Sequence, residues 1–136
     1  MTDARAVAER YDEALGRNDA DGCAATVRAD TKIEVPGAML QGPEQLKGWM
    51  QPFFDAFPDI SHSHTPFEID GNVVRTNLTV KGTNTEPFES PGFGFPATGK
   101  TMDLLARNEL TIEGDHISAL TISFDMNVFM KQLGLA

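Results

Sequence analysis

The chain has 136 residues, of which 40% are hydrophobic and 23% charged, and this length predicts a single domain over residues 1–136. Its formal net charge of −9 argues against nucleic-acid or anionic-membrane partners, because both need a basic surface. The sequence predicts a cytoplasmic protein on three grounds. It has a lone cysteine, Cys23, and its N-terminus is charged and has no apolar signal core. No apolar run approaches the ~20 residues that a membrane span needs.

The N-terminal part has the apolar spacing of helices. Thr2 or Asp3 can cap a first helix, and Asp19 can cap a short second one over Ala20–Val27. The stretch Lys32–Val35 alternates like a strand. A third helix begins near Gly42, and its apolar stripe should face the core. That stripe contains Leu46, Trp49, Met50, Phe53, Phe54 and Phe57.

From Ile60 onward the apolar residues alternate with a period of two, which is typical of strands. Asp70–Asn72 and Glu113–Asp115 read as hairpin turns, and the Gly- and Pro-rich Thr83–Gly99 as one long loop. Met126–Leu133 can form a last helical turn or two. Because helices come first and strands later, the class is α+β, with helices packed on one face of a mostly antiparallel sheet. The predicted strands cover residues 60–69, 73–82, 100–113 and 116–125.

Asp125 is the only acid between Asp115 and the C-terminus, and it lies in an otherwise apolar run. A carboxylate is rarely buried without a partner, so Asp125 either marks the solvated end of a strand or faces a cavity. If Ile112 pairs with Ile117 across the Gly114 turn, regular alternation puts Asp125 opposite Leu104. The same register gathers a polar patch on an apolar wall, as small-molecule sites have. That patch contains Asn108, Thr121, Ser123 and Asp125.

An apolar pocket raises the pKa of a carboxyl group toward the working pH of a general base. Asp125 could then remove a proton next to a carbonyl group, while Asn108 or Thr121 donates a hydrogen bond to the enolate oxygen. The alternative is that Asp125 caps the following turn, accepting backbone N–H bonds from residues near Val128.

Two other groups of side chains are candidates for ligand binding. His62 and His64 share one strand face, but a metal site needs a third and fourth ligand, so we expect no metal. One of them could line the pocket as a hydrogen-bond donor or second base; alternatively, both face solvent. Trp49 and Phe53 are expected near a hydrophobic ligand, and Phe93 with its neighbouring loop phenylalanines could form an apolar lid.

Four stretches carry a family resemblance, namely Val35–Gly37, Gly42–Leu46 leading to Ala56–Asp59, Gly94–Lys100, and Asp125 followed by Lys131–Gly134. In order and spacing they resemble the SnoaL-like polyketide cyclase family of the nuclear-transport-factor-2-like and ketosteroid-isomerase-like superfamily. The resemblance covers nearly the whole chain. It implies a cone-shaped, curved antiparallel sheet covered by the N-terminal helices (the cystatin-like α+β barrel), a deep pocket and a homodimer.

In characterised cyclases of this family, a pocket aspartate performs acid–base chemistry for an aldol closure without a metal or organic cofactor. Two positions depart from that pattern, because Thr121 stands where an aromatic residue is common and Asn108 where an acid is frequent. The resemblance therefore implies a cofactor-independent enzyme, cyclase-like or isomerase-like, acting on a hydrophobic, carbonyl-bearing small molecule.

Two alternatives stay open. The first is epoxide hydrolysis or epoxide-opening cyclisation on the same fold, which would require Arg107 to join two acids at the base of the pocket. Strand alternation, however, puts Arg107 and Glu109 on the sheet face away from Asp125. A non-catalytic binding or dimerisation module would have a filled or very small cavity, with Asp125 engaged in capping.

Overall fold

The computed structural model describes residues 3–135, and three helices precede most of the sheet. They are α1 (Ala4–Gly16), α2 (Ala20–Ala24) and α3 (Gly42–Ala56). The carboxylate of Asp3 accepts the N–H of Arg5, and that of Asp19 accepts the N–H of Gly22, so each caps a helix start. These caps are as expected, although α2 ends three residues before Val27.

Seven strands form the main sheet, in the order β2-β1-β9-β8-β5-β3, with β4 also paired to β5. All pairs are antiparallel except β1 with β9. The chain ends in α4 (Met126–Gln132). The strands are β1 (Val27–Val35), β2 (Ala38–Gln41), β3 (Ser61–His64), β4 (Glu68–Asp70), β5 (Val73–Thr83), β8 (Thr101–Glu113) and β9 (His116–Phe124).

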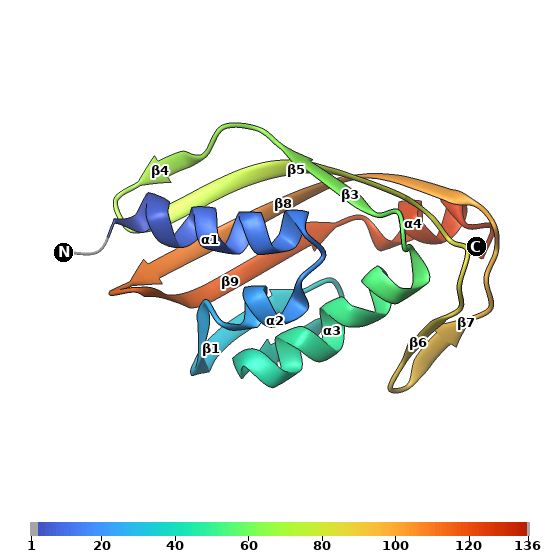
Figure 1. Ribbon diagram of the computed structural model, residues 1–136, viewed down its shortest axis with the longest axis horizontal. Helices are drawn as coiled ribbons and strands as arrows, with labels where there is room; N and C mark the ends of the chain where they lie inside the picture. Colours follow the sequence, from blue (N-terminus) through green and yellow to red (C-terminus); the bar gives the residue numbers. More distant parts are fainter. Residues whose placement is uncertain (1–2, 136) are drawn as a thin grey trace.

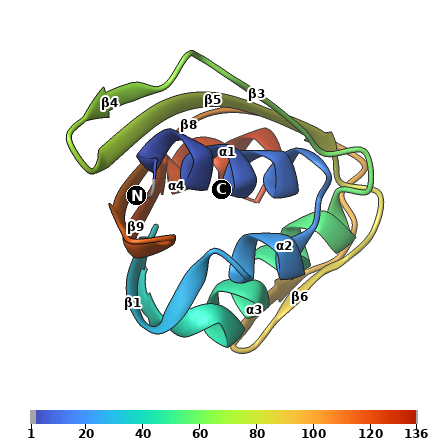
Figure 2. The ribbon, with the colours of Figure 1, turned by 60° about the vertical axis from the view of Figure 1, so that its left-hand side comes forward.

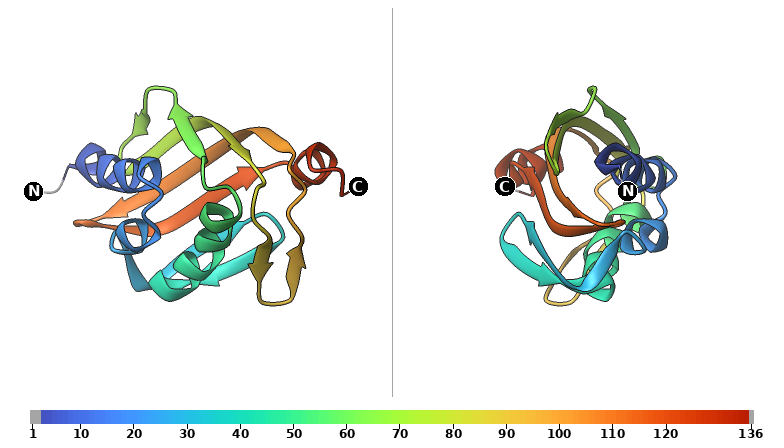
Figure 3. Two further views of the ribbon diagram at one scale, coloured as in Figure 1. Left: turned by 45° about the vertical axis from the view of Figure 1, so that its right-hand side comes forward. Right: turned by 90° about the vertical axis from the view of Figure 1, so that its left-hand side faces the viewer.

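The sheet curves strongly, and α1, α2 and α3 lie across its concave side (Figure 1; Figure 2). The sheet is not closed, and the helices fill its open side when the molecule is viewed along its long axis (Figure 3). Buried apolar residues of both layers form one core, including Tyr11, Leu46 and Ile117. This arrangement confirms the expected α+β class and the curved sheet covered by N-terminal helices.

A β-bulge changes the expected pairing of β8 with β9. Ile112 does face Ile117, but Thr111 pairs with Ala119, so Ser118 is an extra residue on β9. From there on each residue of β9 faces the side opposite to the one predicted, because a one-residue slip reverses every side chain. Asn108 consequently lies opposite Ile122 instead of Thr121. The regular register was wrong.

The segment 83–99 is not a structureless loop, because it contains a hairpin of β6 (Phe88–Ser90) and β7 (Phe93–Phe95). The fully buried Asn84 holds the base of this hairpin. Its amide donates to the carbonyl oxygens of Ala56 (3.3 Å) and Glu86 (2.8 Å). Its oxygen accepts from the backbone N–H and the hydroxyl of Thr98, at 2.9 and 2.8 Å.

The predicted strand over residues 60–69 is two short strands, β3 and β4, separated by a segment that contains Pro66. Proline has no N–H for a sheet ladder, which accounts for the break. The strand β2 was not expected at all. Among residues 3–135, no helix has the length and apolar character needed to cross a membrane.

Candidate functional site

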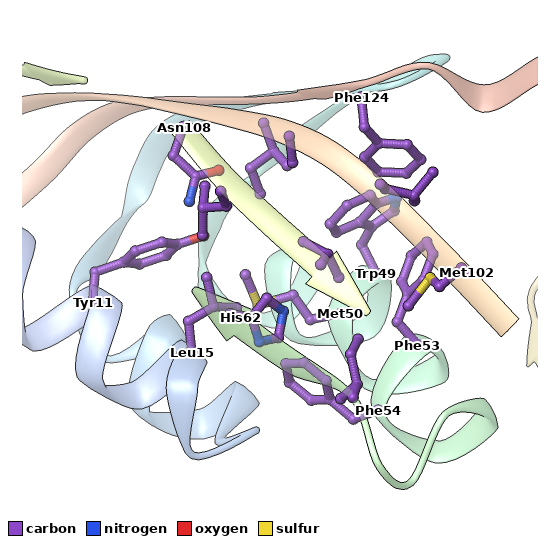
Figure 4. Close-up of a pocket in the computed structure, with 16 residues that line it drawn as sticks. Tyr11, Leu15, Trp49, Met50, Phe53, Phe54, His62, Met102, Asn108 and Phe124 are labelled. Carbon is purple, nitrogen blue, oxygen red and sulfur yellow. The ribbon is translucent and has the colours of Figure 1, made fainter. Parts of the chain in front are cut away.

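A small apolar cavity lies between the helices and the concave face of the sheet. Its volume is about 70 Å³. One wall comes from α1 and α3, and the other from β3, β5, β8 and β9 (Figure 4). Its lining includes the aromatic rings of Trp49, Phe53, Phe54 and Phe124, together with aliphatic residues such as Leu78, Leu104 and Ile122.

Three polar side chains interrupt this lining, namely Tyr11 from α1, His62 from β3 and Asn108 from β8. The hydroxyl of Tyr11 and Nδ1 of His62 are buried without a hydrogen-bond partner among the described residues. The Tyr11 hydroxyl points toward the amide of Asn108 (Figure 4), which is 5% exposed. Buried polar groups are normally paired, so unpaired ones beside a cavity indicate a place for a ligand atom or a water molecule.

Burial determines the protonation of these groups. It raises the pKa of Tyr11 well above its usual value, with smaller contributions from Cys23 and Asp12, so the phenol remains a donor. Burial also lowers the pKa of His62 to about 4, so the imidazole is neutral near pH 7. None of the described lining residues is Asp, Glu, Lys or Arg. The cavity therefore suits an uncharged ligand.

The size of the cavity limits what can enter without rearrangement. An apolar cavity of roughly 150 Å³ can hold benzene, and this one has about 70 Å³. Trp49, Phe53 and Phe124 line it but are only half-buried. These rings belong to one aromatic cluster, with Trp49 and Phe53 centroids 5.0 Å apart. A larger ligand would require these side chains to rotate outward.

The structure gathers some of the predicted site residues and separates others. Asn108, His62, Trp49 and Phe53 all line the cavity. Thr121 and Ser123 do not, because the bulge places them opposite Glu109 and Arg107 on the other face of the sheet. Large apolar residues take their places on the inner face, namely Leu120, Ile122 and Phe124.

Asp125 lies at the end of β9 and is exposed, outside the cavity lining. Its Oδ1 accepts the backbone N–H of Asn127 at 2.9 Å and of Val128 at 3.3 Å. The carboxylate is thus the N-cap of α4. The premise that Asp125 shares a face with Asn108 was wrong, and a catalytic role for Asp125 stays a prediction.

Two further predicted binding residues lie elsewhere. His64 is outside the cavity lining and contacts Asp12, with Nε2 3.0 Å from a carboxylate oxygen. Phe93 is 41% exposed at the β6–β7 hairpin, and its ring packs against Phe88 and Phe95. The hairpin aromatics contact the cavity lining from outside, through Phe53, whose ring lies 5.0 Å from that of Phe88, and through Phe129, which packs between Phe95 and Phe124.

The pair Arg107 and Glu109 lies on the outer face, as predicted. Arg107 donates to Asn77 at 2.8 Å and to Glu68 at 3.3 Å, while Glu109 accepts from Arg75 at 3.0 Å. These are cross-strand ion pairs on the surface, which typically contribute little to stability. In the described part of the chain, no three His, Cys, Asp or Glu side chains are grouped so that they could hold a metal ion.

Sequence reasoning missed Tyr11 as a site residue, because it fits the apolar stripe of α1 and was assigned to the core. The available signal was its chemistry. It is the only tyrosine of the chain, in a helix face otherwise formed by Val7, Ala8, Ala14 and Leu15. A hydroxyl in such a face needs a partner, and none exists among residues 3–135.

Comparison with known proteins adds a family and a fold. The family model for SnoaL-like polyketide cyclases matches residues 5–133, whereas no curated protein sequence matches significantly. AclR from Streptomyces galilaeus, a candidate hydroxylase, is 19% identical with a TM-score of 0.81, over 98% of this chain and 96% of its own. A candidate SnoaL-like polyketide cyclase from Jannaschia sp. CCS1 is 18% identical with a TM-score of 0.83, over 98% and 92%.

A third solved structure has the ketosteroid isomerase-like fold and comes from Catenulispora acidiphila. It is 15% identical with a TM-score of 0.77, over 96% of this chain and 93% of its own. At these identities the structural likeness establishes the fold alone, and the family match covers nearly the full length. The chain therefore belongs to the SnoaL-like polyketide cyclase family.

Proposed function

We propose that this protein is a cofactor-independent acid–base enzyme that acts on an uncharged, hydrophobic, carbonyl-bearing small molecule. The observation that carries the proposal is the hydroxyl of Tyr11, which is buried beside the cavity without a hydrogen-bond partner among the described residues. Together with Asn108 and His62, it supplies the donors and the base that proton transfer next to a carbonyl requires.

In the proposed reaction, the substrate carbonyl oxygen accepts hydrogen bonds from the Tyr11 hydroxyl and the Asn108 amide. His62 removes a proton from the adjacent carbon, and negative charge builds up on the oxygen as the enolate forms. A pKa of about 4 makes free His62 a weak base. The developing negative charge nearby stabilises the imidazolium and so raises that pKa during the step.

The favoured overall reaction is an intramolecular aldol closure. The enolate carbon forms a bond to a second carbonyl carbon, whose oxygen then takes up a proton from the imidazolium of His62. Isomerisation uses the same two groups, with the proton returned to a different carbon. In both cases His62 takes the acid–base role that the sequence assigned to Asp125, because His62 lines the cavity and Asp125 does not.

A small cyclic ketone, which would enter by outward rotation of the half-buried rings of Trp49, Phe53 and Phe124, tests this chemistry without knowledge of the natural substrate. The protein is incubated with cyclopentanone in D₂O, and loss of the α-proton NMR signal is followed over time. We expect exchange at least about tenfold above the buffer rate, and Tyr11→Phe or His62→Gln should return it to near the buffer rate. His116→Gln is the matched control, because that imidazole is outside the cavity. No acceleration by the wild-type protein would contradict the proposal.

One alternative is favoured by specific observations, namely a non-catalytic small-molecule-binding module. The cavity is small, at about 70 Å³, and Asp125 caps α4. This alternative predicts that cyclopentanone shifts the NMR signals of the lining residues without any exchange of its α-protons. Epoxide opening has no such support, because Arg107 lies on the outer face and is paired with Glu68.

We also propose that the protein forms a homodimer through the outer face of the sheet. Leu105 on β8 is 81% exposed there, between the buried Leu104 and the partly buried Ala106. Such an exposed side chain on a strand favours contact with another apolar surface. Sedimentation of wild-type and Leu105→Glu protein distinguishes a dimer from a monomer.

A further inference from the structure

A histidine–acid pair lies between α1 and the edge strand β3, outside the cavity lining. Nε2 of His64 is 3.0 Å from Oδ2 of Asp12, and the two side chains are 37% and 20% exposed. The imidazole also stacks on Phe67, with ring centroids 5.3 Å apart and planes 13° from parallel. Nδ1 of His64 is 2.7 Å from the carbonyl oxygen of Thr65. Both ring nitrogens of His64 therefore face acceptors.

A neutral imidazole has one N–H and cannot donate to two acceptors. The arrangement is satisfied only while the pair keeps an additional proton, on the imidazole or on the carboxyl group of Asp12. Burial raises the pKa of Asp12, and the opposing effect of His64 is smaller. When that proton leaves, the lone pair of Nε2 faces a carboxylate and the contact becomes repulsive.

The position of this pair connects it to the cavity. Asp12 follows Tyr11 in α1, and His64 lies two residues after His62 on the same face of β3. The strand has four residues and pairs within the described sheet only with β5. Within residues 3–135, one other side-chain hydrogen bond joins these two segments, from Asn18 just after α1 to the carbonyl oxygen of Ile60 just before β3, at 3.3 Å.

We propose that Asp12 and His64 are positioning residues, whose proton-dependent hydrogen bond ties α1 to β3 and thereby holds Tyr11 and His62 in place across the cavity. The importance for activity of the spacing between Tyr11 and His62 rests on the proposed function. The hydrogen bond by which Asp12 and His64 join α1 to β3 does not. Loss of the bond frees β3 to move away from α1 and lets water reach the imidazole of His62. The other charged groups at this surface cleft are Arg5, Glu9 and Glu13, all on α1.

The test is an NMR titration of the histidine ring signals in the wild-type chain and in Asp12→Ala, His64→Ala and Glu9→Ala. The pKa of His62 should rise from about 4 toward its ordinary value of 6.5 in the first two variants, because water gains access. Glu9→Ala is the matched control, since Glu9 lines the same cleft and makes no ion pair with His64 among the described residues. It should leave the titration of His62 unchanged.

Amide hydrogen exchange provides a readout that needs no substitution. In the wild-type protein, exchange of the β3 amides, corrected for its intrinsic pH dependence, should accelerate at least about tenfold once the pair loses its proton. An unchanged His62 titration in both folded variants, or pH-independent protection of β3, would overturn the proposal. Neither readout uses a substrate, so absence of α-proton exchange refutes the proposed enzyme and leaves this link standing.

Discussion

The two roles considered for Asp125 make opposite predictions for a pair of substitutions. As N-cap of α4, its Oδ1 accepts two backbone N–H groups that have no partner within the helix. Asp125→Ala removes both bonds, whereas Asp125→Asn and Asp125→Ser keep a capping oxygen and remove the acid. Capping therefore predicts a loss of stability for alanine only, and catalysis predicts a loss of activity for all three.

The expected magnitude follows from how α4 is attached. Loss of an N-cap oxygen costs about 1 kcal/mol. The helix has seven residues, but Phe129 is 0% and Leu133 is 1% exposed, so it docks into the main core and should unfold with it. The cost should therefore appear in global unfolding, as a decrease in Tm of about 3–4 °C for a chain of this length.

Urea denaturation followed by circular dichroism measures the free energy of unfolding of the three variants. Asp30→Ala is the control, because Asp30 is an exposed aspartate on β1 that caps no helix. We expect the asparagine and serine variants within about 0.3 kcal/mol of wild type, with unchanged exchange of cyclopentanone α-protons. The capping argument is refuted if alanine at position 125 has no effect on stability. A stable asparagine variant without exchange activity would restore Asp125 as a catalytic residue.

Three further predictions concern buried polar groups. Tyr11→Phe should raise the free energy of unfolding by about 1 kcal/mol, measured in urea, because it removes a buried hydroxyl that has no partner among residues 3–135; equal or lower stability would imply a bound water there. His62 has a pKa of about 4 in the folded protein, so the unfolded chain binds more protons between pH 6.5 and 4. Stability should fall by at most ~3 kcal/mol as the pH decreases across that window, and His62→Gln should remove this component from the pH profile of the urea midpoint. Asn84→Ala should lower the free energy of unfolding, measured in urea, by about 3 kcal/mol and should speed amide hydrogen exchange at Thr98. The reason is that the backbone groups of Ala56 and Thr98 at the base of the β6–β7 hairpin lose their hydrogen-bond partner. Unchanged exchange at Thr98 would contradict the anchoring role.

Local patterns in the sequence were sufficient for the helices and for one face of the sheet. The caps Asp3 and Asp19 act on their nearest neighbours, and the alternation of β8 places Asn108 inside because each strand residue faces opposite to the next. The break between β3 and β4 was not predicted, although Pro66, which lacks a donor, was a local signal for it. Such features depend on contacts within a few residues, and the sequence records those contacts directly.

The sequence also held a signal for the bulge that regular alternation overlooked. Leu120, Ile122 and Phe124 keep a period of two that is out of phase with Ile117. A strict register would expose all three large apolar side chains and bury Thr121 and Ser123, at a cost of several kcal/mol. The change of phase after Ile117 is what a single extra residue produces.

Only the tertiary structure decided where that extra residue goes and what it does to the site. Thr31 of β1, far away in the sequence, donates its hydroxyl to the carbonyl oxygen of Ile117 at 2.6 Å, beside an irregularity in the pairing of β1 with β9. A buried carbonyl group must be satisfied by some donor, and here it comes from the neighbouring strand. The sequence alone determined an acidic α+β chain of the SnoaL-like family with an apolar, helix-covered sheet. The pairing of strands that are far apart in the sequence, and their packing against the helices, determined that Tyr11, His62 and Asn108 line the cavity and that Asp125 does not.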